Sequence, residues 1–308
     1  MGVKDHRFRH TAMAAPFEII VPEGGGLAYA QQASAAVFEE IDLIEKALSR
    51  FLEASDVSQI NHLPADEWAR VGHHTIACLK VAAELCARTG GTFDVTVGPL
   101  MRCWRNKDGS PRQPSDAELA EARSRVGIDL LELDESEQRV RVKKEGVSVD
   151  LGGIGKGYAV DCAAAILTEW EISSALINGG TSTVLALDAP PGEAGWMVGV
   201  GGTNQDPEGG GRIALCHKAL SGSGTDARGR HIMDPRTGVP VGDKVAAWSL
   251  CPSATVADAL STAFMVMPIS AIKEYCAKYP DTSGMVAFEE DGQTRRRSFG
   301  AWALVGEG

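Results

Sequence analysis

The segment 150–161, DLGGIGKGYAVD, most constrains how this chain folds, because it places four glycines between an apolar stretch and a helix. Before it, Val147, Val149 and Leu151 alternate with polar residues, which is the period of a half-buried strand. After it, apolar residues recur every four positions over 158–170 and mark one face of a helix. The pattern predicts a strand that turns through the glycines into a helix.

The glycine turn is compatible with a phosphate site and with an ordinary tight turn. Glycines before a helix let backbone N–H groups approach an anion, and the N-terminus of a helix favours negative charge. A Walker loop is excluded because Asp150 stands where that loop needs a glycine. A dinucleotide-binding G-x-G-x-x-G is excluded because it would need a glycine at Tyr158.

The size and charge of the chain limit its partners. At 308 residues and 44% hydrophobic content it can bury a large core. The net charge is −11 and the isoelectric point is near 5.2, so nucleic acid and anionic membrane surfaces are poor partners. No run approaches the ~20 apolar residues of a membrane helix. We expect no nucleic-acid partner and no membrane insertion, and a phosphate ligand would need local cations or a metal.

Cysteine usage and the first residues suggest a cellular location. The seven cysteines have no C-x-x-C spacing, and several occupy apolar positions like small core residues. Such usage favours a reducing compartment. Residues 1–11 are basic and polar, with no apolar stretch of a signal peptide behind them. The sequence therefore predicts a cytoplasmic protein.

Elsewhere the chain mixes helices and strands. Helical spacing is found at 37–51, 76–86, 255–267 and 272–278. Strands are predicted at 17–21, 175–180, 196–200, 213–216 and 246–251, with a last hairpin turning at 291–292.

A histidine pair, His73 and His74, precedes the second of these helices. Two histidines suggest a metal site, but the sequence places no third ligand beside them. We therefore expect them to be surface residues at a helix start.

The segment 92–100 is rich in β-branched residues and carries one carboxylate, Asp94. From the residues alone it is an ordinary strand whose Asp94 caps the following turn.

A histidine stands directly before the turn 234–238, Asp-Pro-Arg-Thr-Gly. Proline and glycine explain the turn by themselves. They do not explain His231, which can take or give a proton near neutral pH. A catalytic histidine and a structural one both remain open at this point.

The predicted helix 255–267 carries Asp258 and Thr262 four residues apart, on one face. A carboxylate and a hydroxyl in this arrangement are oxygen ligands suited to Mg²⁺. Alternatively, Asp258 serves the helix N-terminus, since it stands three residues after Thr255.

Taken together, six segments resemble the ApbE family, the FAD:protein FMN transferases. They are 48–61, 93–100, 150–161, 176–180, 231–238 and 254–267, in the order of the family. Each motif is modest alone, but six in order are highly specific, and the resemblance extends over nearly the whole chain from Met13 onward.

The resemblance implies an α+β fold related to the T-fold, with mixed or antiparallel sheets and packed helices. Residues 1–12 are then an N-terminal polar tail, and 13–308 form an ApbE-like flavin transferase domain, as one body or two intimate lobes. The implied reaction is Mg²⁺-dependent transfer of the FMN half of FAD to a Ser or Thr hydroxyl of a partner flavoprotein, with release of AMP.

Site residues follow by motif from the same resemblance. The Gly155 carbonyl and the side chains of Asp258 and Thr262 would hold the metal, and Lys156 would add a cation near the phosphates. Phe51 stands where the family has an aromatic that stacks on adenine. Other positions would line the FAD pocket, namely Met13, Thr92, Phe93, Asp94 and Ile232. His231 would be the base for the acceptor hydroxyl.

The chain departs from the family pattern at three places, one of which is 13–17, which only loosely matches the family's entry motif. Residues 181–183, Thr-Ser-Thr, follow the Asn-Gly-Gly of 178–180, where the family often has an aspartate. The region 221–230 is shorter than usual.

Two alternative functions share the same pocket: an FAD pyrophosphatase that releases FMN and AMP, and a non-catalytic FAD-binding or carrier protein, which would not need the metal pair.

Overall fold

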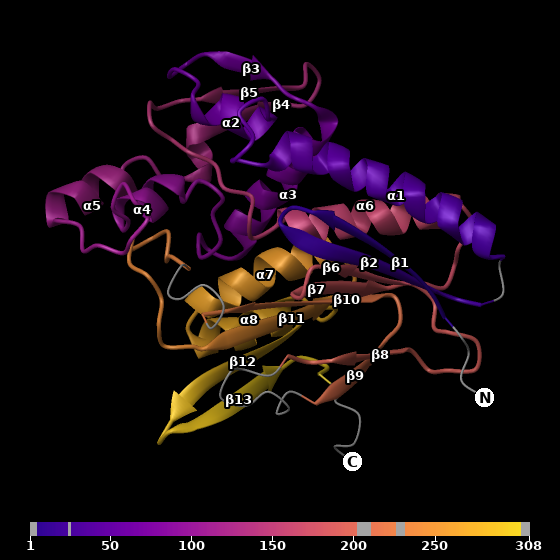
Figure 1. Cartoon of the computed structure of the whole chain (residues 1–308). Coiled ribbons are helices and arrows are strands. Elements are labelled where there is room, and N and C mark those ends of the chain that lie inside the picture. The colour runs from indigo at the N-terminus through magenta and orange to yellow at the C-terminus, as the bar shows by residue number, and fades with distance from the viewer. Residues whose placement is uncertain (1–4, 24–25, 202–210, 226–231, 303–308) are drawn as a thin grey trace.

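The computed structural model describes residues 5–23, 26–201, 211–225 and 232–302 (Figure 1). Its centre is an eight-stranded sheet in which every neighbouring pair is antiparallel. In spatial order the strands are β1 (Asp5–Ala12), β2 (Ala15–Pro22), β6 (Leu176–Gly179), β7 (Thr183–Ala186), β10 (Lys218–Gly224), β11 (Ala246–Cys251), β12 (Ser283–Glu290) and β13 (Gln293–Phe299). The antiparallel sheet and its helices confirm the predicted α+β class.

Helices cover one face of this sheet. In Figure 1, α7 lies against the strands of the sheet, and α6 and α1 form a further layer above it. The bounds are α1 (Leu27–Leu48), α3 (His73–Arg88), α6 (Gly155–Glu169), α7 (Ala254–Val266) and α8 (Ile269–Lys278). The main core fills the space between these layers, with Phe17, Phe264 and Leu167 among its fully buried side chains.

A second apolar cluster lies on the other face of the sheet. The hairpin of β8 (Trp196–Gly199) and β9 (Arg212–Leu215) packs there, and both Trp196 and Trp248 belong to the cluster. The sheet is therefore buried on both faces over its central strands, and this explains why all six residues of β11 are buried.

The remaining elements cluster near the C-terminal end of α1. A small antiparallel sheet has the order β3 (Trp68–Arg70), β5 (Arg139–Val142) and β4 (Leu131–Asp134). The short helices are α2 (Asp56–Asn61), α4 (Gly98–Cys103), α5 (Asp116–Arg123) and the 3₁₀ turn η1 (Ile128–Leu130). All seven cysteines are free, as expected from their scattered positions.

The structure differs from the predicted polar tail at the N-terminus. Residues 5–12, expected as part of a polar tail, form β1 and pair along their whole length with β2. The hydrophobic pattern does not reveal this strand, because most of its side chains are charged or polar. Such side chains are typical of an exposed sheet edge. Arg9 pairs with Glu18 of β2, with the nitrogen and oxygen 2.7 Å apart.

The predicted strand before the glycine turn is also wrong. Val147, Val149 and Leu151 are buried, as their alternation indicates, but the segment makes only an isolated bridge, from Ser148 to Val97. The side-chain amide of Asn61 takes the place of a neighbouring strand. It accepts from the Val149 N–H at 2.6 Å and donates to the Val149 carbonyl at 3.0 Å.

The segment 92–97 forms no strand either. The carboxylate of Asp94 accepts from the N–H and the hydroxyl of Thr96, at 2.8 and 2.6 Å. Such a short-range turn takes up the backbone donors that a strand would use. The predicted role of Asp94 in capping a turn is thereby confirmed.

The histidine pair differs from its prediction in one member. His73 is exposed at the first turn of α3, as expected, but His74 is buried with an exposed fraction of 6%. The partner that the sequence could not reveal is Glu40, which reaches the pair from α1.

Close packing of α6 against α7 depends on Gly157. A Cβ atom at this position would lie 2.2 Å from the Ala254 carbonyl oxygen and 2.8 Å from the Cβ of Asp258. No side chain fits in this space, so the two helices meet backbone to backbone.

We predict that Gly157→Ala lowers the free energy of unfolding by about 1–3 kcal/mol, because the added methyl group forces α6 and α7 apart. Urea denaturation measures the change. Gly155→Ala on the same helix is the matched control, since its Cβ would meet only Leu48, at 3.9 Å, and should not destabilise. Equal destabilisation by both substitutions would contradict this account.

Candidate active site

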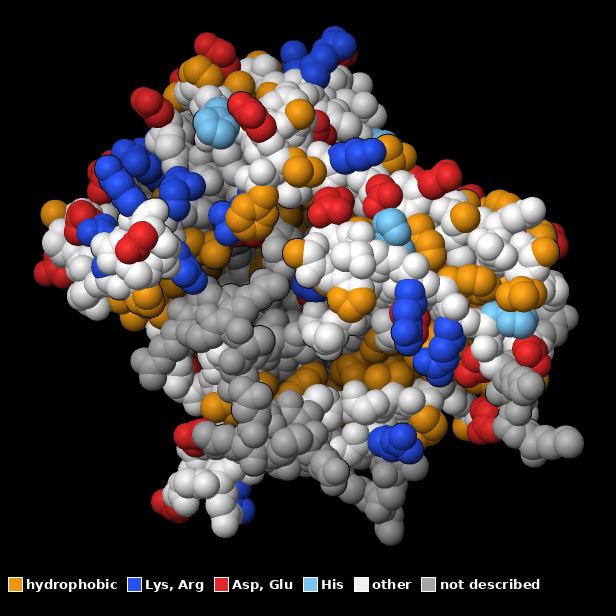
Figure 2. Space-filling view, in the orientation of Figure 1, with side chains coloured by type: hydrophobic (Ala, Val, Ile, Leu, Met, Phe, Trp, Pro, Cys, Tyr) orange, Lys and Arg blue, Asp and Glu red, His pale blue; other side chains and the backbone are white. Residues whose placement is uncertain are grey.

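A cavity of about 750 Å³ opens where the helical layer meets the sheet. Figure 2 shows a hollow on this side of the molecule with hydrophobic side chains at its floor. Its walls come from the β1–β2 turn, the glycine turn, the start of α6, and strands β7, β10 and β11. Residues that line it include Met13, Gly153, Lys156, Thr183, Ser223, Trp248 and Asp258.

Asp258 provides the buried charge of this cavity, with an exposed fraction of 3%. One carboxylate oxygen accepts from the Gly157 N–H at 3.0 Å and lies 3.7 Å from the Lys156 ammonium. The other accepts from the hydroxyls of Thr183 and Ser221, each at 3.3 Å. Asp258 does not cap its own helix, since the side chain of Ser253 does this. The alternative role at the N-terminus of its own helix is therefore wrong, and the carboxylate instead accepts from the first turn of α6.

Asp161 of α6 fixes the start of α7. Its carboxylate accepts from the Ser253 hydroxyl at 2.7 Å and from the backbone N–H groups of Ala254 and Thr255, at 2.7 and 2.9 Å. These donors would otherwise be unsatisfied at a helix N-terminus, where a negative charge is also favourable. Asp161 thereby sets the position of α7, and with it the position of Asp258.

Thr262 lies one turn after Asp258 on α7. Its hydroxyl is 3.1 Å from the Ser223 hydroxyl. The glycine turn approaches it closely, because a Cβ built on Gly153 would lie 3.2 Å from the Thr262 hydroxyl oxygen. Gly155 instead belongs to the first turn of α6 and faces Leu48. The structure thus brings Asp258, Thr262 and the glycine turn together.

This set of oxygen donors fits a hard cation. Asp258 lines the cavity together with Gly152 and Gly153 of the glycine turn, and the Thr262 hydroxyl contacts Ser223, another residue of the lining. Magnesium prefers such oxygen ligands and usually binds through one or two carboxylates plus phosphate oxygens and water. The residues present therefore suit Mg²⁺ better than a metal that needs nitrogen or sulfur ligands.

The turn between β1 and β2 brings Met13 to the cavity. Ala12 pairs with Ala15, so Met13 and Ala14 form a two-residue turn, and both have positive φ, 52° and 56°. This is the geometry of a type I′ hairpin turn, which ordinarily favours Asn and Gly. Two non-glycine residues in this conformation store strain at the rim of the cavity.

Phe51 lies outside the cavity lining, with 80% of its side chain exposed. The Arg50 guanidinium stacks 4.3 Å from the ring centroid and pairs with Asp150 at 2.8 Å.

Arg50 also lines a second cavity of about 680 Å³, together with Arg102, Arg105 and Lys107. Figure 2 shows Lys and Arg side chains gathered near α4 and α5 on this face. A cationic surface with an exposed aromatic can accept an anionic, ring-bearing ligand.

Thr92, Phe93 and Asp94 are all buried, but only one of them reaches the glycine turn. The Phe93 ring lies 3.5 Å from where a Cβ of Gly153 would be. The Thr92 hydroxyl donates to the Thr89 carbonyl at 3.0 Å, and Asp94 also accepts from the Ile128 N–H at 3.0 Å. Thr92 and Asp94 therefore use their polar atoms within the fold.

His231 lies outside the described residues, so its catalytic role stays a prediction. Ile232, the next residue, is buried, and its carbonyl accepts from the Val241 N–H at 2.9 Å. The predicted turn follows: Gly238 has φ +77° and donates to the Asp234 carbonyl at 2.7 Å. Arg236 closes the turn with two hydrogen bonds to the Asp234 carboxylate.

Three hydroxyl residues of the site were missed from the sequence. Thr183 and Ser221 surround Asp258 and lie 2.9 Å from each other, and Ser223 contacts Thr262. Thr183 is part of the 181–183 segment that departs from the family pattern, so that departure places a hydroxyl beside the buried carboxylate. A signal was present in the alternation of Ser221 and Ser223, which points both side chains to one face of a strand.

Comparisons with known proteins show the family of this chain. The sequence profile of the ApbE family matches residues 13–286. This chain belongs to the ApbE family. No helix in the described part of the chain is long and apolar enough to cross a membrane.

Relatives within the ApbE family share about a quarter of the sequence. The chain is 27% identical over 258 residues to a protein of Klebsiella pneumoniae named FAD:protein FMN transferase, covering 78% of this chain and 72% of that protein. The ApbE protein from Thermotoga maritima is 30% identical, with a TM-score of 0.82 over 95% of this chain and 97% of that chain. Flavin transferase ApbE from Vibrio cholerae has a TM-score of 0.84 at 23% identity, covering 97% of this chain and 98% of that chain, and shows the shared fold.

We predict that Asp161→Ala lowers the free energy of unfolding by about 1–2 kcal/mol, because α7 loses the acceptor for its first N–H groups. Urea denaturation checks the value. Asp188→Ala is the control, since half of the Asp188 side chain is exposed and its carboxylate makes an ion pair with the exposed His217. If Asp161→Ala were as stable as this control, the anchoring role of Asp161 would be wrong.

Proposed function

We propose that this protein transfers the FMN moiety of FAD to a Ser or Thr hydroxyl of a partner flavoprotein and releases AMP. The observation that carries the proposal is that Asp258 and the glycine turn line one cavity, with Thr262 beside Gly153 and Ser223 at its wall, in a chain of the ApbE family. The acceptor oxygen forms a bond to the phosphorus of the FMN half, the pyrophosphate P–O bond breaks, and the oxygen leaves on AMP.

The metal set that we propose is Asp258, Thr262 and one carbonyl of the glycine turn. The sequence resemblance pointed to Gly155 for that carbonyl. We propose Gly153 instead, because it is the glycine beside Thr262, whereas Gly155 is the first residue of α6, a position where backbone carbonyls ordinarily accept helical hydrogen bonds. When bound there, Mg²⁺ would neutralise charge on the pyrophosphate as the P–O bond breaks.

The protein groups around this set bind and orient the substrates. Lys156 supplies a positive charge at the cavity, which an anionic pyrophosphate needs in a chain of net charge −11. We place the flavin and phosphates of FAD against Met13, Phe93 and Ile232, and the adenine against exposed Phe51. Thr92 and Asp94 support this wall from inside the fold. His231 would take the proton of the acceptor hydroxyl.

Two features of the proposal stay predictions. One is the cytoplasmic location and the other is the identity of the acceptor. The experiment must distinguish group transfer from two other outcomes. One is hydrolysis of FAD by water at the same site, and the other is FAD binding without turnover.

The direct test incubates the protein with FAD and Mg²⁺, with and without a flavoprotein that carries a threonine flavinylation motif. AMP release and the mass of the acceptor are followed together. The proposal expects AMP release matched by an FMN-sized mass gain. AMP release with no gain across a panel of acceptors would identify a hydrolase, and FAD binding with no AMP would identify a carrier.

We predict that Asp258→Asn lowers AMP release at least about 100-fold, because the carboxylate ligand is lost while the shape of the side chain is kept. FAD binding, measured by the flavin fluorescence, should persist in part. Asp188→Asn, on the surface and outside the cavity, is the control and should keep full turnover. Unchanged turnover in Asp258→Asn would contradict the assignment of Asp258 as a metal ligand. A second variant, His231→Ala, tests the proposed base, and unchanged turnover in it would contradict that role.

A further inference from the structure

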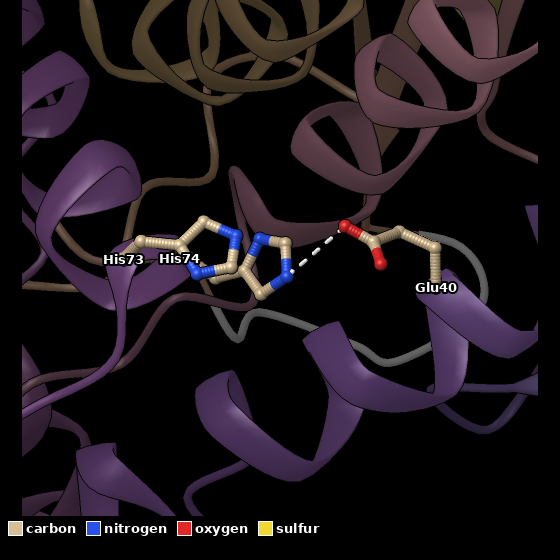
Figure 3. A group of neighbouring side chains, drawn as sticks. All are labelled: Glu40, His73 and His74. Atoms are coloured by element: carbon tan, nitrogen blue, oxygen red, sulfur yellow. Dashed lines mark ion pairs between the residues drawn. The ribbon is translucent and has the colours of Figure 1, made fainter.

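Three side chains with metal-binding atoms meet away from the cavity described above. They are Glu40 of α1 with His73 and His74 at the start of α3, and none of them lines that cavity. Figure 3 shows the two imidazole rings side by side, with the Glu40 carboxylate directed at His74. The ring centroids are 3.8 Å apart, and one ligand atom of each residue lies within 4.8 Å of the others.

His74 is the buried member, and one of its nitrogens is directed at Glu40 without a hydrogen bond. Its exposed fraction is 6%. The Nε2 atom lies 3.2 Å from a Glu40 carboxylate oxygen, yet no hydrogen-bond partner for Nε2 is found among the described residues. A buried polar nitrogen without a hydrogen bond is costly, so this geometry points to a ligand between Nε2 and the Glu40 carboxylate.

The other nitrogen of His74 already has a partner that fixes the ring. Nδ1 lies 3.2 Å from the hydroxyl of Tyr158, which also hydrogen-bonds to Cys162. Metal-bound histidines typically donate their second N–H to such a group, which sets the tautomer and leaves the first nitrogen free to coordinate. Here that arrangement leaves Nε2 facing Glu40.

The electrostatic surroundings favour a cation between these side chains. The Glu40 carboxylate lies 3.2 Å from Nε2 of His74, so a negative charge already faces the position where an ion would bind. Asp56 adds a second carboxylate near the group while it accepts from the Gly72 N–H and the Thr75 hydroxyl, both at 2.7 Å. This contact also fixes the start of α3, and with it the backbone of the two histidines.

We propose that Glu40, His73 and His74 form a binding site for a first-row transition-metal ion of the Zn²⁺ class. Two histidines and one glutamate are a known ligand set for zinc, with the fourth position left to water or another ligand. Ligands about 2.1 Å from one ion lie at most about 4.2 Å apart. The ligand atoms here lie within 4.8 Å of one another, so metal binding would draw them together by rotation of the exposed His73 and the part-buried Glu40.

The bound ion would join α1 to the start of α3 across the connection that carries Phe51. The site is distinct from the oxygen-donor set of Asp258 and Thr262, because imidazole nitrogens suit zinc and not magnesium. The inference does not rest on the proposed flavin transfer.

The test is a titration of the metal-free full chain with Zn²⁺ in a large excess of Mg²⁺, which occupies oxygen-donor sites. Calorimetry and metal analysis of the desalted protein should give one Zn²⁺ per chain. Bound Zn²⁺ should also raise the melting temperature, since it binds only the folded state. Wild type that retains no Zn²⁺ would overturn the proposal.

The deciding variant is His73→Ala, because His73 is exposed and its removal should leave the metal-free fold intact. We expect Zn²⁺ affinity to fall at least about tenfold, with the metal-free melting temperature unchanged. Glu40→Gln should also weaken binding, and Tyr158→Phe should do so through His74. His217→Ala is the matched control, an exposed histidine paired with Asp188 at 2.7 Å, and it should bind as wild type does. Equal Zn²⁺ binding by His73→Ala and wild type would refute the site.

Discussion

The contact between α6 and α7 is the constraint on which the rest of the structure depends. It needs a bare backbone at Gly157, where a side chain would strike the Ala254 carbonyl. It also needs a carboxylate at Asp161, which accepts the first N–H groups of α7. These two residues lie one helical turn apart on α6. Together they fix the position of α6 against α7, which lies about a hundred positions later in the sequence.

The contact between α6 and α7 explains how the Asp258 carboxylate comes to be buried beside the glycine turn. With α7 held in place, the Asp258 carboxylate meets the Gly157 N–H and the hydroxyls of β7 and β10. A buried carboxylate is stable only when such donors or a cation surround it. The same helix places Thr262 beside Gly153 and within 3.1 Å of the Ser223 hydroxyl, at the wall of the cavity that Asp258 lines. The glycine-rich segment therefore permits close packing of α6 on α7 and also forms part of the cavity wall, through Gly152 and Gly153.

Local sequence patterns predicted the elements that depend on local rules. The helix after the glycine turn, strand β11, the Asp234 turn and the last hairpin formed as their spacing indicated. The predictions failed where a distant side chain decides the local structure. The stretch at Val149 alternates like a strand, but Asn61 supplies its hydrogen bonds from 88 positions away.

Long-range partners also limited what the sequence revealed about sites. Asp258 and Thr262 were found from their helical spacing, and the family resemblance gave them a role. Nothing in the local sequence showed that Asp258 contacts Gly157, or that Thr183 lies beside it. In the same way, His73 and His74 looked like surface residues because Glu40 stands 33 positions before them and only the packing of α1 on α3 brings it close.

The central claim is that the α6–α7 contact builds a divalent-cation site under the glycine turn. A crystal structure of the full chain with FAD and Mn²⁺ in place of Mg²⁺ tests it most directly, since the anomalous signal of Mn²⁺ locates the ion. This account predicts a peak in contact with the Asp258 carboxylate, the Thr262 hydroxyl and the Gly153 carbonyl, next to the pyrophosphate. A peak elsewhere in the cavity, or FAD bound with these three groups uncoordinated, would contradict it.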